Sequence, residues 1–504
     1  MRESPAQQSR RHKYFNMKIF TKIALVAVAT LMLAGETLAG GLMTNSNQSA
    51  SFLRSIARGT SLDPDAVHTN PAGTVFMSNG FHFGISDQMA YQTRTINSTY
   101  APFAMGAQNN GLTSKEFKGT VFSPLIPSFH FVWKHNRWSV MAGMGVNGGG
   151  GELKFDKGLG SFERMFSVLP VGMNQLGINA TAYDLDMQLI GKSQTLAFQV
   201  GAAFRINDWL SIAAQLRYST TSNAYEGHMK NISVVVGGQK TPASTLFQGA
   251  LTQLQAQYQQ VVGALGAESP EAQQLMAAMQ SVGANAVKTA DHILDVKQKG
   301  HSISPVIALY GNWGKWTASV KYEFKMATEL EIESAPVSAN DAVINSLFPN
   351  GAKVKAETPA LLSIAISRQL GPVKLTIETH DYFDKNAENS FSPAVDGNTS
   401  EILFGAEWQV CKKLMLSAGV QRTQTHLISA NYSDMNFLTP STSVGFGVAY
   451  NFSEKVRLNL GIMPTFYDKV TSTGVVADTQ LPFTDVYDRT SLAWGIGLDF
   501  NFGK

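Results

Sequence analysis

The feature that most restricts the fold of this chain is a two-residue alternation of apolar with small or polar side chains. In the C-terminal segment 492–502 every second residue is apolar, namely Leu492, Trp494, Ile496, Leu498, Phe500 and Phe502. The residues between them are Ala493, Gly495, Gly497, Asp499 and Asn501. Successive side chains of a β-strand point to opposite faces, so the pattern predicts a strand with one wholly apolar face. Segments 195–206, 209–218 and 315–326 repeat it.

The connections between these strands have a rhythm of their own. Short polar joins are expected at 134–137, 207–208, 311–315, 370–372, 411–413 and 453–455. Long joins are expected at 96–118, 149–182, 226–296, 334–353, 386–397, 429–438 and 470–485. A soluble β-sandwich would lack this long and short alternation. The rhythm instead predicts an all-β fold, an antiparallel transmembrane β-barrel of about fourteen strands, with short joins at one rim and long ones at the other.

Composition excludes several other classes. Only 15% of the residues are charged, against about a quarter in soluble domains. The net charge is +3 and the basic residues are dispersed, so no nucleic-acid partner is expected. Cys411 is the sole cysteine, which rules out an intramolecular disulfide. No nucleophile elbow or metal-ligand spacing is present, so we expect no enzyme, no catalytic residue, no metal site and no cofactor.

The N-terminus predicts a secretory signal peptide over residues 1–39. Lysines at 18 and 22 precede an apolar run from Ile23 to about Gly35, and small residues at 37 and 39 place cleavage after Ala39. Met17 alone begins a complete signal, so residues 1–16 are a candidate upstream extension. The alternative, an uncleaved membrane anchor, is disfavoured because the run is short.

Residues 40–79 do not follow the strand pattern and precede the first strand at Gly80. Short helices are expected in 47–59, ended by Gly59, and in 63–73, before Pro71. The segment is too small to have its own core, so it is predicted to plug the barrel. As a loose extension it would expose Phe52, Leu53, Ile56 and Leu62.

A second exception is the long connection 226–296. It predicts two helices broken between Gly266 and Pro270, with Ser269 as the N-cap of the second helix. Strand parity puts this helical insertion on the extracellular rim. A self-packed lid and an apolar groove that collects ligand are both compatible with it.

The motif Asp65-Ala66-Val67-His68-Thr69-Asn70-Pro71-Ala72-Gly73 resembles the hatch signature of the FadL-type outer-membrane transporters of long-chain fatty acids and aromatic hydrocarbons. The resemblance also covers 358–383 and 400–421. It implies a monomeric, plugged barrel in which hydrophobic ligand passes from extracellular loops to the lumen and leaves through a lateral gap as the hatch rearranges. The candidate hatch residues are then Asp65, Asn70, Pro71 and Ala72.

The same resemblance places the lateral gap in the third strand. Its candidate residues are Asn147, Gly148, Gly149, Gly150 and Gly151, since a run of glycines favours bulges; that these glycines merely open the next loop is an equal alternative. Arg217 and Lys321 point inward by parity and are candidate anchors for a ligand carboxylate. Glu323 and Glu378 also point inward, and the alternative is that they simply neutralise Arg217 and Lys321.

The sequence therefore predicts passive transport of hydrophobic small molecules across the outer membrane of a Gram-negative bacterium. The expected partners are a hydrophobic ligand and outer-membrane lipid. The alternative is a structural or partner-binding barrel, such as a secretion-machinery scaffold, with the helical insertion as its docking surface.

Overall fold

A computed structural model describes residues 46–175, 177–390, 395–428, 432–434, 437–476 and 479–503. The predicted signal peptide lies outside these residues, as does the start of the predicted plug. None of the helices within them is long and apolar enough to cross a membrane.

The described strands form one antiparallel sheet that closes into a barrel of fourteen strands. The first half of the wall is β1 (Gly80–Tyr100), β2 (Ser114–His135), β3 (Trp138–Phe155), β4 (Ala180–Arg205), β5 (Leu210–Val236), β7 (His292–Trp313) and β8 (Trp316–Glu323). The second half is β11 (Leu361–Leu370), β12 (Val373–Tyr382), β13 (Thr399–Gln409), β14 (Leu414–Gln424), β15 (Ser441–Asn451), β16 (Val456–Tyr467) and β18 (Leu481–Asn501). β18 pairs with β1 from Asn501↔His82 to Phe483↔Tyr100, which seals the wall.

Four short strands and the helices belong to the segments that the wall strands connect. The strands are β6 (Gln239–Pro242), β9 (Glu329–Ser334), β10 (Lys353–Lys355) and β17 (Val470–Val476). The N-terminal helices are α2 (Ala50–Ser55), α3 (Ala66–Thr69) and the 3-10 helix η1 (Pro71–Phe76). Those of the long connections are η2 (Ala101–Met105), α4 (Gly160–Ser167), α5 (Leu169–Gln175), α6 (Ala243–Leu265), α7 (Pro270–Lys288), α8 (Pro336–Ala339), α9 (Ala342–Leu347) and η3 (Asp384–Asn386).

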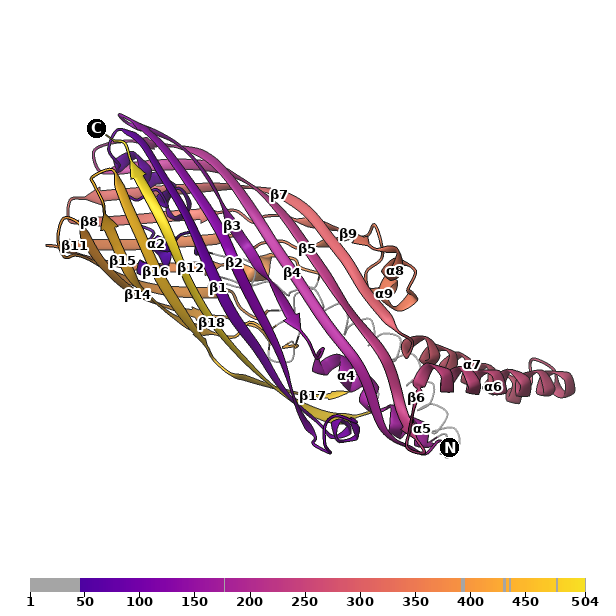
Figure 1. Ribbon diagram of the computed structural model, residues 1–504. Helices are drawn as coiled ribbons and strands as arrows, with labels where there is room; N and C mark the ends of the chain where they lie inside the picture. The colour runs from indigo at the N-terminus through magenta and orange to yellow at the C-terminus, as the bar shows by residue number, and fades with distance from the viewer. Residues whose placement is uncertain are drawn as a thin grey trace, which may run out of the picture.

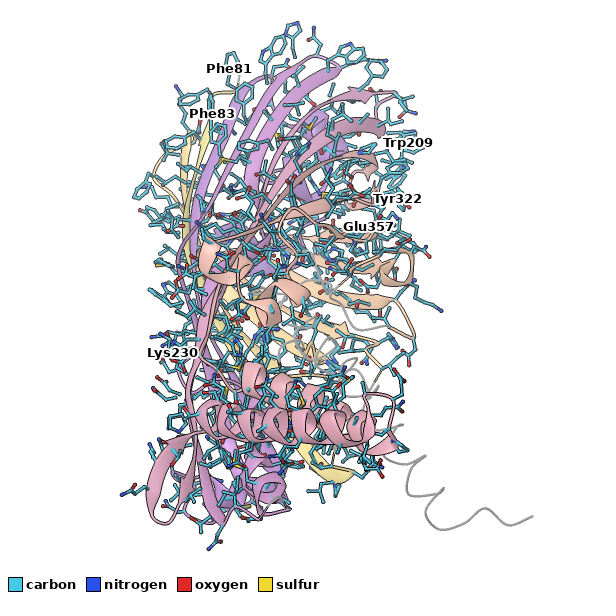
Figure 2. The ribbon with its side chains drawn as sticks, turned by 90° about the vertical axis from the view of Figure 1, so that its right-hand side faces the viewer. Phe81, Phe83, Trp209, Lys230, Tyr322 and Glu357 are labelled. Atoms are coloured by element: carbon cyan, nitrogen blue, oxygen red, sulfur yellow. The ribbon has the colours of Figure 1, made fainter. Side chains whose placement is uncertain are left out.

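The outer surface of the wall is apolar over the middle of the strands. Side chains such as Ile85, Val200, Ile303 and Ile402 are more than half exposed there, while their inward neighbours are small or polar. Aromatic side chains gather at the rim of short turns, namely Phe81, Trp133, Trp138, Trp209, Trp313, Trp316, Trp408 and Phe502. Figure 2 shows Phe81, Phe83 and Trp209 at this end and Lys230 toward the other. An apolar band with aromatic residues at its edge is the surface of a transmembrane barrel.

The strands extend farther beyond this band than the sequence predicted. β5 runs to Val236, so residues 226–236 are strand although the sequence predicted part of the helical connection there. The predicted connection 470–485 likewise holds β17 and the start of β18. These residues lack a one-sided apolar face, because they lie beyond the apolar band and meet water and other loops instead of lipid.

The helical pair α6 and α7 projects from the long-loop end of the barrel (Figure 1). The Ser269 hydroxyl accepts a hydrogen bond from the Ala272 amide, and Pro270 occupies the first turn, as the sequence predicted for the second helix. That helix ends at Lys288, and the residues after His292 pair with β5 as part of β7.

Candidate functional site

The N-terminal residues 46–77 lie inside the barrel. α2 packs against β13, β14, β15, β16 and β18, and η1 against β2, β3, β4, β5 and β7. The Ser49 side chain caps α2 by accepting from the Phe52 amide. Phe52, Leu53 and Ile56 are buried, whereas Leu62 is 40% exposed. The segment therefore crosses the lumen from one side of the wall to the other (Figure 1).

Inward-facing glycines of the wall strands allow the backbone of α2 to approach the wall closely. A Cβ added at Gly405 or Gly445 would lie 2.4 Å from a backbone oxygen of α2, and one added at Gly461 would lie 2.7 Å from another. No other residue type fits at such distances, because real Cβ contacts are longer. The inward glycines that alternate with apolar residues on these strands thus mark the place where the segment rests.

Two arginines of this segment bind one carboxylate of the wall, and one of them also binds two aspartates of the segment itself. Arg58 donates to both oxygens of Asp65 at 2.9 Å, to Asp63 at 2.8 Å and to Glu407 of β13 at 3.1 Å. Arg54 also donates to Glu407, at 2.9 Å, and Arg457 of β16 pairs with Asp63 at 2.7 Å. Both arginines of the segment are at most 2% exposed. Buried charges need this degree of pairing, since removal from water is costly.

The predicted hatch residues lie within or beside this network. The Asp65 carboxylate accepts hydrogen bonds from the Arg58 guanidinium and from the hydroxyls of Ser49 and Ser61. The Asn70 side chain accepts from the Ala72 amide at 3.1 Å and donates to the Leu309 carbonyl of β7 at 3.3 Å. Pro71 begins η1.

The Ala72 carbonyl accepts from the Ser211 hydroxyl of β5 at 2.6 Å. Asn70 and Ala72 therefore fasten the segment to two neighbouring wall strands. A gating role for these residues stays a prediction.

The two predicted carboxylate anchors are brought together, and both already have an anion. Arg217 and Lys321 each pair with Glu323, and the three side chains are at most 7% exposed. Lys321 also donates to the His68 carbonyl of the N-terminal segment at 2.9 Å. A ligand carboxylate at this point would have to compete with Glu323.

The predicted lateral-gap residues lie where two wall strands separate. β2 pairs with β3 up to Phe122↔Glu152 and again from Phe129↔Met144, and the residues between are unpaired with each other. The ladder to β4 also shifts register twice, between Val146 and Gly148 and between Gly149 and Gly151. β3 nevertheless continues to Phe155, so the glycines form bulges within the strand and do not end it.

Two features at this gap escaped the sequence prediction. Pro124 and Pro127 lie in the part of β2 that is not paired with β3, and a proline cannot donate to a ladder. Their presence within an alternating strand was the available signal. The N-terminal segment contacts the β3 side of this gap, since the Gln48 side chain donates to the Val146 carbonyl at 2.8 Å.

A large apolar cluster lies in the half of the barrel nearer the long loops. Inward side chains of the long strands and of the loop helices form one buried cluster, whose members are Ile96, Tyr100, Phe103, Phe117, Val121, Leu153, Phe155, Leu159, Phe162, Met187, Tyr225, Leu294, Val296, Ile332, Ile344, Phe348, Phe437 and Tyr487. Barrel interiors are usually polar. This part of the lumen therefore has far more buried apolar side chains than a barrel interior usually has, beside a few paired charges such as Arg164–Asp485.

A small pocket opens beside this cluster. Its lining is almost wholly apolar and comes from α4, β4, β5, β7 and α9, with Phe162, Met187, Leu189, Met229, Leu294, Val343, Ile344 and Leu347 as the main members. His228 and His292 contribute the polar edge, where each pairs with an aspartate at 3.2 and 2.7 Å. No lysine or arginine is part of the lining.

Buried charges fix α4, which supplies one wall of the pocket. Arg164 pairs with Asp485 of β18 at 2.8 Å, and the Ser161 amide donates to Asp434 at 2.6 Å. Burial raises the pKa of the Asp434 carboxyl, because the charged form has lost its water. The sequence prediction missed this pocket, since its residues come from three separate connections whose approach follows only from the closed barrel.

No protein-family model and no curated protein sequence matches the chain. Several solved structures are similar to it. A FadL homologue from Pseudomonas aeruginosa is 14% identical, with 93% of this chain and 100% of that one covered and a TM-score of 0.58. A deletion mutant of the TodX monoaromatic hydrocarbon channel is 14% identical, with 91% and 99% covered and a TM-score of 0.50.

At this level of identity the similarity establishes the fold. The alternation of short turns and long loops, the fourteen strands and the apolar band agree with it. The chain has the FadL-type fold, that of an outer-membrane β-barrel.

Proposed function

We propose that this protein is a passive channel for hydrophobic small molecules in the outer membrane of a Gram-negative bacterium. The observation that carries the proposal is the apolar pocket and cluster in the half of the barrel nearer the long loops. Ligand sites are typically concave and mostly apolar, with few polar groups. An apolar chamber at the long-loop end offers a hydrophobe its first protein contact.

The same chamber favours a neutral ligand over a carboxylate. The pocket lining has no lysine or arginine, and its two histidines already pair with aspartates. In the lumen, Arg217, Lys321 and Arg164 are likewise paired with Glu323 or Asp485. A carboxylate brought here would be buried without a partner, which is unfavourable. Aromatic or aliphatic hydrocarbons meet no such cost.

Passage beyond the chamber requires the N-terminal segment to move, and we assign it the role of a hatch. It packs against wall strands on both sides of the lumen, and its Gln48 side chain bonds to β3 beside the gap between β2 and β3. A shift of this segment would break that bond and uncover the bulged glycines and the two prolines. Lateral release of ligand into the membrane at this gap is the route that these features support.

Uptake by cells tests the proposal. Cells that lack the protein and cells that carry it on a plasmid would be given radiolabelled naphthalene, dodecanoate and methyl dodecanoate. We expect the protein to raise uptake of the neutral compounds more than that of the acid. Val343→Trp fills the pocket and should lower uptake about tenfold, because losing about 1.4 kcal/mol of apolar contact is a tenfold change in affinity.

The matched control is Val337→Trp on α8, an exposed position outside the pocket. Equal uptake with and without the protein would contradict the proposed transport. Uptake that is faster for dodecanoate than for its ester would contradict only the preference for neutral ligands.

A further inference from the structure

We propose that the outer surface of the barrel binds one anionic glycerophospholipid at the hairpin between β7 and β8. The site is independent of transport. It combines a groove for an acyl chain with two cations for the phosphate, at the rim where the membrane interface meets the short turns.

The groove lies between two tryptophans. Trp313 and Trp316 face each other across the hairpin, and the shallow groove beside them is lined also by Thr317, Ala318 and Ile366. Both indole side chains and Ile366 are between 44% and 51% exposed. The small side chain of Ala318 creates the depression between these larger neighbours.

The groove faces lipid and not the lumen. The Ser319 hydroxyl donates to the Gly59 carbonyl inside the barrel, so the neighbouring Ala318 and Val320 point outward. Trp209 stacks on Trp313 with ring centroids 5.2 Å apart, which fixes one side of the groove. An acyl chain lying along Ala318 and Ile366 would cover apolar surface and meet the indole rings edge-on.

Two cations stand at the mouth of this groove. Arg368 points outward on β11, opposite Trp316 in the ladder, and its guanidinium carbon lies 4.9 Å from the Trp316 ring centroid. Lys315 is exposed in the turn next to Trp316. Among the described residues neither cation has a carboxylate partner, and Asp208 of the adjacent turn is paired with Arg205 at 3.0 Å.

An outward arginine at the edge of the apolar band needs an anion from its surroundings. Cations on the lipid face are unfavourable at depth and favourable at the interface, where headgroup phosphates lie. Arginine binds phosphate through parallel hydrogen bonds, and the stacked Trp316 ring orients its plane. A phosphodiester above the groove would satisfy Arg368 and Lys315 while its acyl chain occupies the space below.

Fluorescence quenching tests the site in the full chain. The protein would be reconstituted into phosphatidylcholine vesicles with increasing fractions of phosphatidylglycerol brominated on its acyl chains. We expect tryptophan quenching to contain a component that saturates at a low fraction of the brominated lipid. In Arg368→Gln/Lys315→Gln the half-saturating fraction should rise at least about fivefold, as expected when phosphate contacts are lost.

Two further variants separate groove from charge. Ala318→Leu fills the groove without changing charge and should give a similar shift. Lys412→Gln/Lys413→Gln removes two cations from another turn of the same rim and should behave as wild type. Retained lipid counted by native mass spectrometry provides a second reading for each folded variant.

The proposal is overturned if the wild type and the Arg368/Lys315 variant have the same half-saturating fraction, or if the Lys412/Lys413 control shifts equally. It is also overturned if brominated phosphatidylcholine gives the same low half-point, because then the headgroup charge is not recognised.

Discussion

Arg58 shows how one side chain holds the N-terminal segment within the barrel. Its guanidinium connects Asp63 and Asp65 of the segment to Glu407 of the wall, with 2% of the side chain exposed. Such a network stabilises only when complete, since removing one partner leaves buried charge uncompensated. The segment is thus fixed by a charge balance that a single substitution can disturb.

Replacing Arg58 by methionine keeps most of the side-chain volume and removes the charge. We expect the seating of the segment to lose about 3–5 kcal/mol, the cost of breaking a buried ion pair. Planar-bilayer recordings should then show frequent ion-conducting openings that the wild type lacks. Arg422→Met, which breaks the exposed pair with Asp468, serves as the control, and a variant at Arg58 as closed as wild type would contradict this view of the network.

At the scale of elements, the sequence predicted correctly which side chains of a strand point outward, but it predicted poorly where the strands end. The two-residue alternation in 195–206 agrees with the structure, where Phe198 faces outward and Gln199 is buried. The predicted N-cap Ser269 is also confirmed, because both patterns depend on nearby residues only. The extension of β5 to Val236 and of β3 through its glycines depends on pairing with distant strands. So do the partners of Arg217 and Lys321 and the apolar pocket, which no local pattern contains.

The N-terminal segment and β3 can be joined to test whether the segment must move. A Cβ at Gly143 would lie 3.1 Å from Val67 Cγ1, close to the distance of about 3.0 Å between a Cβ and the far sulfur of a disulfide. Val67→Cys/Gly143→Cys in a Cys411→Ser background should therefore form a disulfide. We expect the oxidised protein to lose uptake of the hydrophobe and a reductant to restore it.

Each single-cysteine variant under the same oxidant is the control for that experiment. Unchanged uptake with a complete disulfide would exclude a displacement of α3 from β3 as part of the transport cycle.

The whole molecule has two unlike ends, and this fixes its expected orientation. The tight turns and the chain end gather at one rim, while α6, α7 and the other loop helices lie at the opposite one (Figure 1). Outer-membrane barrels place short turns in the periplasm and long loops outside. The single cysteine, Cys411, is exposed in a short turn and offers a direct probe of this arrangement.

In intact cells we expect Cys411 to resist a 5-kDa polyethylene-glycol maleimide, which is too large to cross the outer membrane, and to react once that membrane is permeabilised. Ala267→Cys between α6 and α7, in a Cys411→Ser background, should react without permeabilisation. The reverse pattern on a gel would show that the barrel has the opposite orientation.

The resting place of α2 has a consequence for biogenesis. The helix lies on strands from β13 to β18, and Arg54 bonds to Asn459, 405 residues away along the chain. These strands are translated last, so the N-terminal segment is synthesised long before the strands on which α2 packs. Contacts between residues so far apart in the chain form slowly. We therefore expect α2 to reach its final position only late in folding, once β13 to β18 have formed.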